Sequence, residues 1–230
     1  MEKLKVRSSS GSSKVFESKE ESTIVQKFES ATVAKRIATI MIKLLELKKV
    51  SYEIKLQKGF GPKKEILLYT TLNYGPFEYI VSFQYYIEED KTIVWEKIAP
   101  LNSSKFLLSA PFLEKNVIKI CYDIFKALTA LKKINIVHND CVLDNIGIRK
   151  NNFVLFDFDG SGTPEEKGKD FSDDIRTLLN SFKFRDVNIP KFTSIGDIIG
   201  YVMNARKITA PFALVYLEEL PIQYDLGSEK

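Results

Sequence analysis

The sequence predicts an α+β protein in which a small antiparallel sheet precedes a mostly helical part. Strand-like runs stand at 23–28, 80–86 and 91–95, where β-branched and aromatic residues cluster. Apolar residues instead repeat at helical spacing over 31–49 and again over Phe112–Lys133. A chain of 230 residues can form one large domain or two small lobes.

The composition is typical of a globular protein that stays inside the cell. Hydrophobic residues make up 44% of the chain and include 16 Phe, which is ample for a core. No apolar run reaches the ~18 residues of a membrane span, and the first residues lack a signal-peptide segment. Two cysteines are too few for a disulfide framework, which favours a reducing compartment. We therefore expect a cytoplasmic protein that does not contact a membrane.

The net charge of +4 is unevenly distributed along the chain. Residues 1–65 carry 15 Lys and Arg against 8 acids, whereas acids are in excess in the remainder. A basic first third can attract phosphates or nucleic acid, or it can simply be a solvated face. Aromatic and basic residues do not alternate, so we expect no nucleic-acid partner.

The first elements are two strands around a turn of small residues, followed by a third strand and a helix. Val6–Phe16 contains the turn, which is rich in serine, and Thr23–Phe28 reads as the next strand. Ser30 is a plausible N-cap for the helix over 31–49.

The chemistry is concentrated in the second half of the chain. His138 is the only histidine, and Asp140 and Asn145 follow it closely. A short strand over 153–156 ends at Asp157, so this carboxylate stands at the edge of a core, where it needs a cation. Asp140, Asn145 and Asp157 offer the hard oxygen ligands that Mg²⁺ prefers.

These residues resemble two motifs of the protein-kinase-like superfamily. His138–Asn145 reads H-N-D-C-V-L-D-N and resembles the catalytic loop H-R-D-L-x-x-x-N, while Asp157–Asp159 stands where D-F-G is expected. The resemblance implies a bilobal fold, with an antiparallel-sheet N-lobe at 1–97 and a minimal, mostly helical C-lobe at 98–230. It implies ATP and Mg²⁺ as cofactors. Asp140 would then accept the proton of the acceptor hydroxyl, and Asn145 and Asp157 would hold the metal.

The resemblance also implies a set of nucleotide-binding residues in the first lobe. The family's glycine-rich phosphate loop falls on serines here, so its contacts would come from Ser10, Gly11, Ser12 and Ser13. A flexible serine-rich segment remains the alternative.

Two valines and a lysine would complete that nucleotide site. Val15 and Val25 would cover the adenine, and Lys27 would contact the α- and β-phosphates. Lys55 is the competing lysine, but no phosphate loop immediately precedes it.

In the family, a glutamate on the following helix pairs with this lysine. We expect Glu65, on a helix that starts near residue 63, which makes 31–49 an additional helix. Glu46 is the alternative partner. Between the lobes, the Glu96 carbonyl and the Ile98 N–H would meet the adenine edge.

The sequence also departs from the family's pattern. Asn139 replaces an arginine, and only a short segment separates Asp157 from the next helix, so we expect no regulation by phosphorylation of an activation loop. Val142 replaces a lysine that neutralises the transferred phosphate, and Asp159 replaces a glycine. Asp174 is expected to brace the catalytic loop.

The resulting hypothesis is an ATP- and Mg²⁺-dependent phosphotransferase, namely a divergent Ser/Thr kinase with a protein substrate. A small-molecule kinase similar to aminoglycoside or choline kinases is the first alternative, favoured by the short segment and by Val142. A pseudokinase that serves as a binding or scaffold module is the second, favoured by the serine-substituted loop and Asp159. Helical patterns near 194–206 and 212–220 complete the minimal second lobe.

Overall fold

The computed structural model describes residues 6–9, 13–17, 23–47, 52–58, 65–71 and 78–187. Over these residues the protein is α+β, with small antiparallel sheets and several helices, as the sequence predicts. None of the helices in these ranges combines the length and apolar character of a membrane span. The predicted phosphate-loop residues Ser10, Gly11 and Ser12 and the predicted helices at 194–206 and 212–220 lie outside the described residues.

The chain divides into two compact units. The first comprises residues 1–77 and 81–97, and the second comprises 78–80 and 98–230. The short segment 78–80 belongs to the second unit because it pairs there with a strand. The Leu155 N–H donates to the Tyr79 carbonyl at 2.9 Å, next to a parallel bridge between Ile80 and Leu155.

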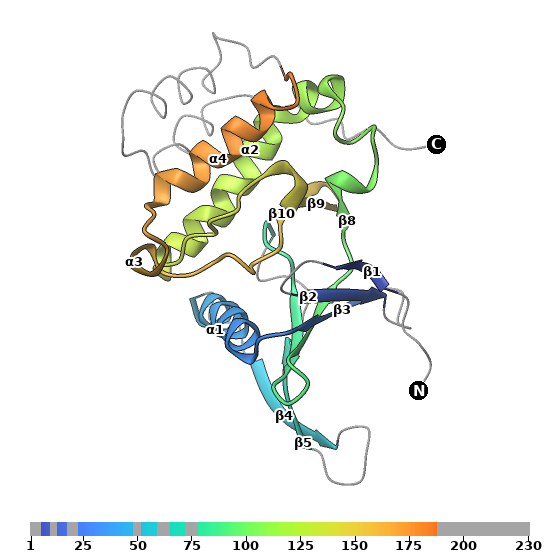
Figure 1. The fold of residues 1–230 in the computed structure, drawn as a ribbon, viewed down its shortest axis with the longest axis vertical. Helices are drawn as coiled ribbons and strands as arrows, with labels where there is room; N and C mark the ends of the chain where they lie inside the picture. Colours follow the sequence, from blue (N-terminus) through green and yellow to red (C-terminus); the bar gives the residue numbers. More distant parts are fainter. Residues whose placement is uncertain are drawn as a thin grey trace. The chain divides into compact units, whose positions relative to one another are not determined.

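The first unit is built on a five-stranded antiparallel sheet with the order β1-β2-β3-β7-β6 (Figure 1). Its strands are β1 (Val6–Ser9), β2 (Ser13–Glu17), β3 (Thr23–Phe28), β6 (Phe83–Ile87) and β7 (Thr92–Glu96). A separate two-stranded antiparallel ribbon consists of β4 (Tyr52–Lys58) and β5 (Glu65–Thr71). Strand β7, which lies between β3 and β6, is buried along its whole length and therefore belongs to the core of this unit.

The helix of this unit, α1 (Ala31–Leu47), forms where the helical periodicity predicts it. Its buried stripe includes Ile37, Met41 and Leu44. The hydroxyl of Ser30 accepts the Val33 N–H at 3.4 Å, as expected of an N-cap.

The predicted helix around Glu65 is wrong, because Glu65–Thr71 forms strand β5. This strand pairs residue by residue with β4, from Glu65 opposite Lys58 to Thr71 opposite Tyr52. The run Glu-Ile-Leu-Leu-Tyr-Thr-Thr ends in aromatic and β-branched residues, which favour a pleated strand. A short apolar run fits either periodicity, so its pairing partner decided the outcome. Within the described part of the first unit, α1 is therefore not an additional helix.

In the second unit one long helix packs against a small sheet, and a second helix packs against the first. Helix α2 (Ala110–Lys133) lies beside α4 (Phe171–Lys183), as Figure 1 shows. The sheet has the order β10-β9-β8. The remaining elements are β8 (Ala99–Pro100), β9 (Ile146–Arg149), β10 (Asn152–Leu155), the 3-10 turns η1 (Leu101–Ser103) and η2 (Leu143–Asn145), and the short helix α3 (Pro164–Lys167).

A glycine allows strands β8 and β9 to approach closely. A Cβ on Gly147 would lie 2.6 Å from Ile98 Cδ1 and 3.1 Å from the Ala99 carbonyl oxygen. Ile98 is buried, and its side chain therefore occupies the space above Gly147. This contact fixes the start of β9, which directly follows Asn145.

A buried ion pair joins α2 to β10. The Lys119 ammonium contacts both Asp123 carboxylate oxygens at 2.5 Å, and the Asp123 carboxylate also accepts the Phe153 N–H at 2.8 Å. Burial raises the pKa of Asp123 to about 6, although Lys119 and the Phe153 amide oppose that rise. The pair is expensive to desolvate, but it fixes β10 on α2.

Candidate catalytic site

The candidate site lies in the second unit, in the loop between Val137 and η2. Val137 forms an antiparallel bridge with Gly162, with N···O distances of 2.9 and 3.2 Å. The loop therefore begins at a point tied to the segment that follows β10. Two stretches more than 20 residues apart in the sequence are held together at this position.

Asp174 braces this loop from the first turn of α4. One carboxylate oxygen accepts the His138 N–H at 2.7 Å, and the other accepts the Asn139 N–H at 2.8 Å. Asp174 is only 4% exposed, and burial raises its pKa to about 6, with the two amides opposing the rise. The bracing role predicted for Asp174 is confirmed by these contacts.

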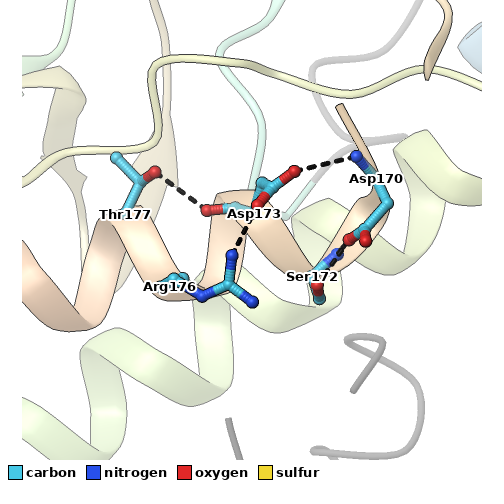
Figure 2. Close-up of polar contacts among 5 residues, drawn as sticks. All are labelled: Asp170, Ser172, Asp173, Arg176 and Thr177. Carbon is cyan, nitrogen blue, oxygen red and sulfur yellow. Dashed lines mark hydrogen bonds and ion pairs between the residues drawn. The ribbon is translucent and has the colours of Figure 1, made fainter. Parts of the chain in front are cut away.

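The position of Asp174 depends on two helix caps in the segment before it. Thr163 caps α3 and Asp170 caps α4, each with a complete capping box. Figure 2 shows the second cap, in which the Asp170 carboxylate accepts the Ser172 N–H at 2.6 Å and Asp173 accepts the Asp170 N–H at 2.9 Å. Arg176 adds an ion pair to Asp173 at 2.7 Å. The start of α4 at Phe171 is thus fixed three residues before Asp174.

His138 is fully buried and supports the loop through its ring. Its Nε2 lies 3.1 Å from the Phe156 carbonyl oxygen, and its ring packs edge-on against Phe158 with the centroids 4.9 Å apart. Burial lowers the pKa of His138 to about 4, against the nearby Asp140 charge. The imidazole is therefore neutral at physiological pH, with Nε2 as the donor to Phe156. It supports Phe156, the residue before Asp157, and its low pKa disfavours a role as a proton acceptor at physiological pH.

Asp140 and Asn145 are hydrogen-bonded to each other. The Asn145 side-chain amide donates to the Asp140 carboxylate at 2.8 Å and to the Asp140 carbonyl at 3.0 Å. Asp140 itself is exposed, whereas Asn145 is buried. The Asn145 backbone carbonyl in turn accepts the Phe156 N–H at 3.0 Å. Asn145 therefore links the predicted base to the strand end that carries Asp157.

Asp157 follows β10 with φ at +65°, and Asn139 also has a positive φ of +67°. Left-handed backbone at a residue other than glycine costs about 1 kcal/mol or more and is concentrated at functional sites. Loss of solvation, together with the charges of Asp159 and Asp140, raises the pKa of Asp157 to about 6. The side chain keeps an exposed edge, so we attribute much of the effect to these neighbouring carboxylates.

The donor set suits Mg²⁺ with few protein ligands. Asn145 uses its amide nitrogen on Asp140, which leaves its carbonyl oxygen to ligate a cation. The charges of Asp159 and Asp140 act on Asp157, and a divalent cation would offset the repulsion among these carboxylates. The described residues contain no group of three or more His, Cys, Asp or Glu placed around one metal position. Mg²⁺ commonly uses one or two carboxylates together with water and phosphate, so the residues present fit this ion.

Two further contacts to the loop were not predicted from the sequence. Ser181 Oγ accepts the Leu143 N–H at 3.3 Å, and Arg185 contacts both Asp144 carboxylate oxygens at 3.0 and 3.1 Å. Together with Asp174 these residues are spaced seven and four apart, so they share one face of α4 and its C-terminal extension. Polar residues at this spacing are the signal that could have identified them.

The predicted nucleotide-binding residues of the first unit are only partly consistent with one site. Val15 pairs with Gln26 across β2 and β3, whereas Val25 pairs with Phe16. Adjacent residues on a strand face opposite sides of the sheet. The expectation that Val15 and Val25 together cover one adenine is therefore wrong, since they lie on opposite faces.

Ser13 is engaged in a hydrogen-bonded relay across three strands. Gln26 Nε2 donates to Ser13 Oγ at 2.9 Å, and Trp95 Nε1 donates to Gln26 Oε1 at 2.9 Å. Ser13 is 3% exposed. Its side chain therefore stabilises the sheet, which leaves its backbone as the group that could bind phosphate.

The other predicted contacts fall on several elements. Lys27 is exposed on β3 and makes no ion pair with a residue whose side chain is described, which includes Glu46 on α1 but not Glu65. Glu65 and the alternative Lys55 lie on the ribbon of β5 and β4. Glu96 ends β7, where its carboxylate accepts the Ser82 N–H at 2.6 Å, and Ile98 begins the second unit. The ion pair predicted between Lys27 and Glu65 stays a prediction.

We compared the chain with models of known protein families and with curated proteins. No family model matches the chain, and none of the curated proteins does.

Proposed function

We propose that this protein is an ATP- and Mg²⁺-dependent phosphotransferase with a two-lobed, kinase-like fold that transfers the γ-phosphate to a hydroxyl of a protein Ser or Thr. The proposal rests on one observation above all: the hydrogen bonds from the Asn145 amide to Asp140 at 2.8 and 3.0 Å. They leave an exposed carboxylate and an amide oxygen side by side, next to a second carboxylate at Asp157.

In this proposal Asp140 is the group that acts on the acceptor. Its exposed carboxylate would accept a hydrogen bond from the attacking hydroxyl and take its proton as the bond to phosphorus forms. The Asn145 amide holds one carboxylate oxygen, so the other remains available to the substrate. Since the Asp140 backbone is itself bonded to Asn145 and Val142, the carboxylate needs little reorganisation before reaction.

Asn145 and Asp157 would hold the metal, through the amide oxygen and the carboxylate respectively. When bound there, Mg²⁺ would neutralise the charge on the phosphate oxygens. The left-handed backbone at Asp157 and the His138–Phe156 contact keep this carboxylate at the end of β10.

A small-molecule acceptor is the second candidate, favoured by the short segment after Asp157. The chain reaches helix α3 at Pro164 and α4 at Phe171, and both helix starts are capped. Little chain is thus free to form a surface for an extended peptide.

The test is transfer of labelled γ-phosphate from Mg-ATP by the purified chain. We expect the wild type to label generic protein acceptors or itself, and Asp140→Asn to lose at least about 100-fold in rate, the usual contribution of a catalytic base. Asp186→Asn serves as a matched control, because Asp186 is exposed beyond α4 and the substitution removes the same charge. Its rate should stay within about twofold of the wild type.

The outcomes separate the candidates. If small alcohols become labelled and reduce the labelling of protein acceptors in the same mixture, the chain is a small-molecule kinase. Equal rates for the wild type and Asp140→Asn would refute the role of Asp140. If Mg-ATP does not bind at millimolar concentration, the pseudokinase alternative replaces both.

A further inference from the structure

Two lysines lie directly opposite each other in the sheet of the first unit. Lys14 on β2 pairs with Lys27 on β3, and the same row continues to Ser9 on β1 and Thr92 on β7. Directly opposite residues in an antiparallel pair project from the same face, with Cβ atoms about 5 Å apart. The two ammonium groups therefore share one face, and no acid occupies a position in this row.

Neither lysine is neutralised within the described part of the chain. Both side chains are exposed, and neither makes a hydrogen bond or an ion pair there. Two other lysines of this unit do have partners. Lys35 contacts Glu88 at 3.3 Å, and Lys91 donates to the Glu29 carbonyl at 2.9 Å.

Like charges placed directly opposite each other destabilise a strand pair. In the free protein the Lys14–Lys27 repulsion therefore lowers the stability of the strand pair, and a bound anion would remove that repulsion. Lysine is a compact ammonium on a flexible stem, which suits contact with phosphate oxygens at several angles. Two such groups from neighbouring strands can contact one phosphate or two adjacent phosphates.

We propose that Lys14 and Lys27 together form a polyphosphate-binding pair, in which Lys14 is a second phosphate contact beside Lys27. This inference deepens the proposed function and rests on it, since the polyphosphate would be that of the nucleotide. Lys14 would contact a phosphate directly, and the ligand would be an anion with two or more linked phosphates. The residues of the pair come from β2 and β3, which are hydrogen-bonded along their whole length.

The proposal predicts that binding and stability change in opposite directions. Lys14→Gln and Lys27→Gln should each weaken tripolyphosphate and Mg-ATP binding about tenfold, as expected for loss of one charge-assisted hydrogen bond. Lys14→Glu should abolish binding in the measured range. It should also raise the melting temperature by about 2 °C, because it replaces a repulsion by a cross-strand ion pair.

The experiment is calorimetric titration of the full chain with tripolyphosphate and with Mg-ATP, together with thermal unfolding without ligand. Lys43→Gln and Lys43→Glu are the matched controls, since Lys43 is exposed on α1 in the same unit and has no partner among the described residues. The Lys43 variants should bind within twofold of the wild type. If the anion were bound only by general attraction to a basic protein, the substitutions at Lys14 and Lys43 would lower the affinity equally.

Several results would overturn the inference. These are equal affinity losses for Lys14→Gln and Lys43→Gln, a lower melting temperature for Lys14→Glu, or a wild type that binds no tripolyphosphate. Label transfer tests the proposed function separately. A wild type that transfers label with Lys14→Gln unimpaired would retain the function and refute the inference. A wild type that binds tripolyphosphate through Lys14 without transferring label would retain the inference about Lys14 and refute the proposed function.

Discussion

His138 should remain neutral in the folded protein down to about pH 4, which makes stability depend on pH in a predictable window. Its imidazole is buried, and burial lowers its pKa to about 4. In the unfolded chain the value is about 6.5. The folded pKa is the lower one, so the contribution of His138 to stability is complete above pH 6.5. It is lost progressively as pH falls from 6.5 towards 4.

The loss of unfolding free energy follows from the difference between the folded and unfolded pKa values of His138. At pH 5 the unfolded imidazole is almost fully protonated, whereas the folded one stays about nine-tenths neutral, which costs about 2 kcal/mol of unfolding free energy. Below pH 4 the loss approaches its full value of about 3.4 kcal/mol, the 2.5-unit difference at 1.36 kcal/mol each. Asp123, Asp157 and Asp174 titrate in the same range, so a comparison is needed that cancels them.

The comparison is between the wild type and His138→Gln, whose side-chain amide can still donate to the Phe156 carbonyl. Urea unfolding at pH 7.5 and pH 5.0 should show the advantage of the wild type shrinking by about 2 kcal/mol at the lower pH. Because the chain has one histidine, a single imidazole signal in the NMR spectrum reports the same pKa directly. A signal that titrates near 6.5, or a stability difference that does not change with pH, would refute the reasoning.

Two further substitutions test the contacts that hold the catalytic loop. Asp174→Asn should lower the unfolding free energy by about 1–3 kcal/mol and reduce phosphate transfer, because one of the two buried amides of His138 and Asn139 loses its acceptor. Urea unfolding measures the loss, and a change no larger than that of Asp186→Asn would contradict it. Lys119→Met should cost about 3 kcal/mol at pH 7, since it leaves Asp123 buried without its cation. Adding Asp123→Asn should restore part of that loss, and a double variant no more stable than Lys119→Met would argue against the ion pair as the cause.

The elements predicted best from the sequence are those with a long, regular pattern. The helix expected over Phe112–Lys133 is α2 (Ala110–Lys133), because its apolar residues keep the 3.6-residue period over six turns. The strand expected over Thr23–Phe28 has those bounds in β3. The run from Glu65 was misassigned because seven residues are too few to distinguish the two periods. Its pairing with the preceding strand β4 was not predicted.

In the candidate site too, residues close together in the sequence were easier to predict than contacts between distant residues. Asp140 and Asn145 belong to one short stretch of sequence, and the structure brings their side chains into hydrogen-bond contact. Their roles and that of Asp157 in holding a metal or a substrate stay predictions. The contacts of Ser181 and Arg185 could not be predicted, since each joins residues about 40 positions apart. The faces of Val15 and Val25 depend on the register of β2 against β3, which the residue types do not reveal.

The catalytic loop is held by two sets of contacts that differ in burial, and this difference allows stability and activity to be separated. The backbone at 138 and 139 is held by the buried carboxylate of Asp174, so its loss affects folding as well as geometry. The Asp140 carboxylate is exposed and is held by the Asn145 side chain, so its orientation contributes little to folding. The imidazole of His138 is fixed by burial between Phe156 and Phe158. It follows that changes at Asp140 should reduce phosphate transfer with little loss of stability, while changes at Asp174 should reduce both.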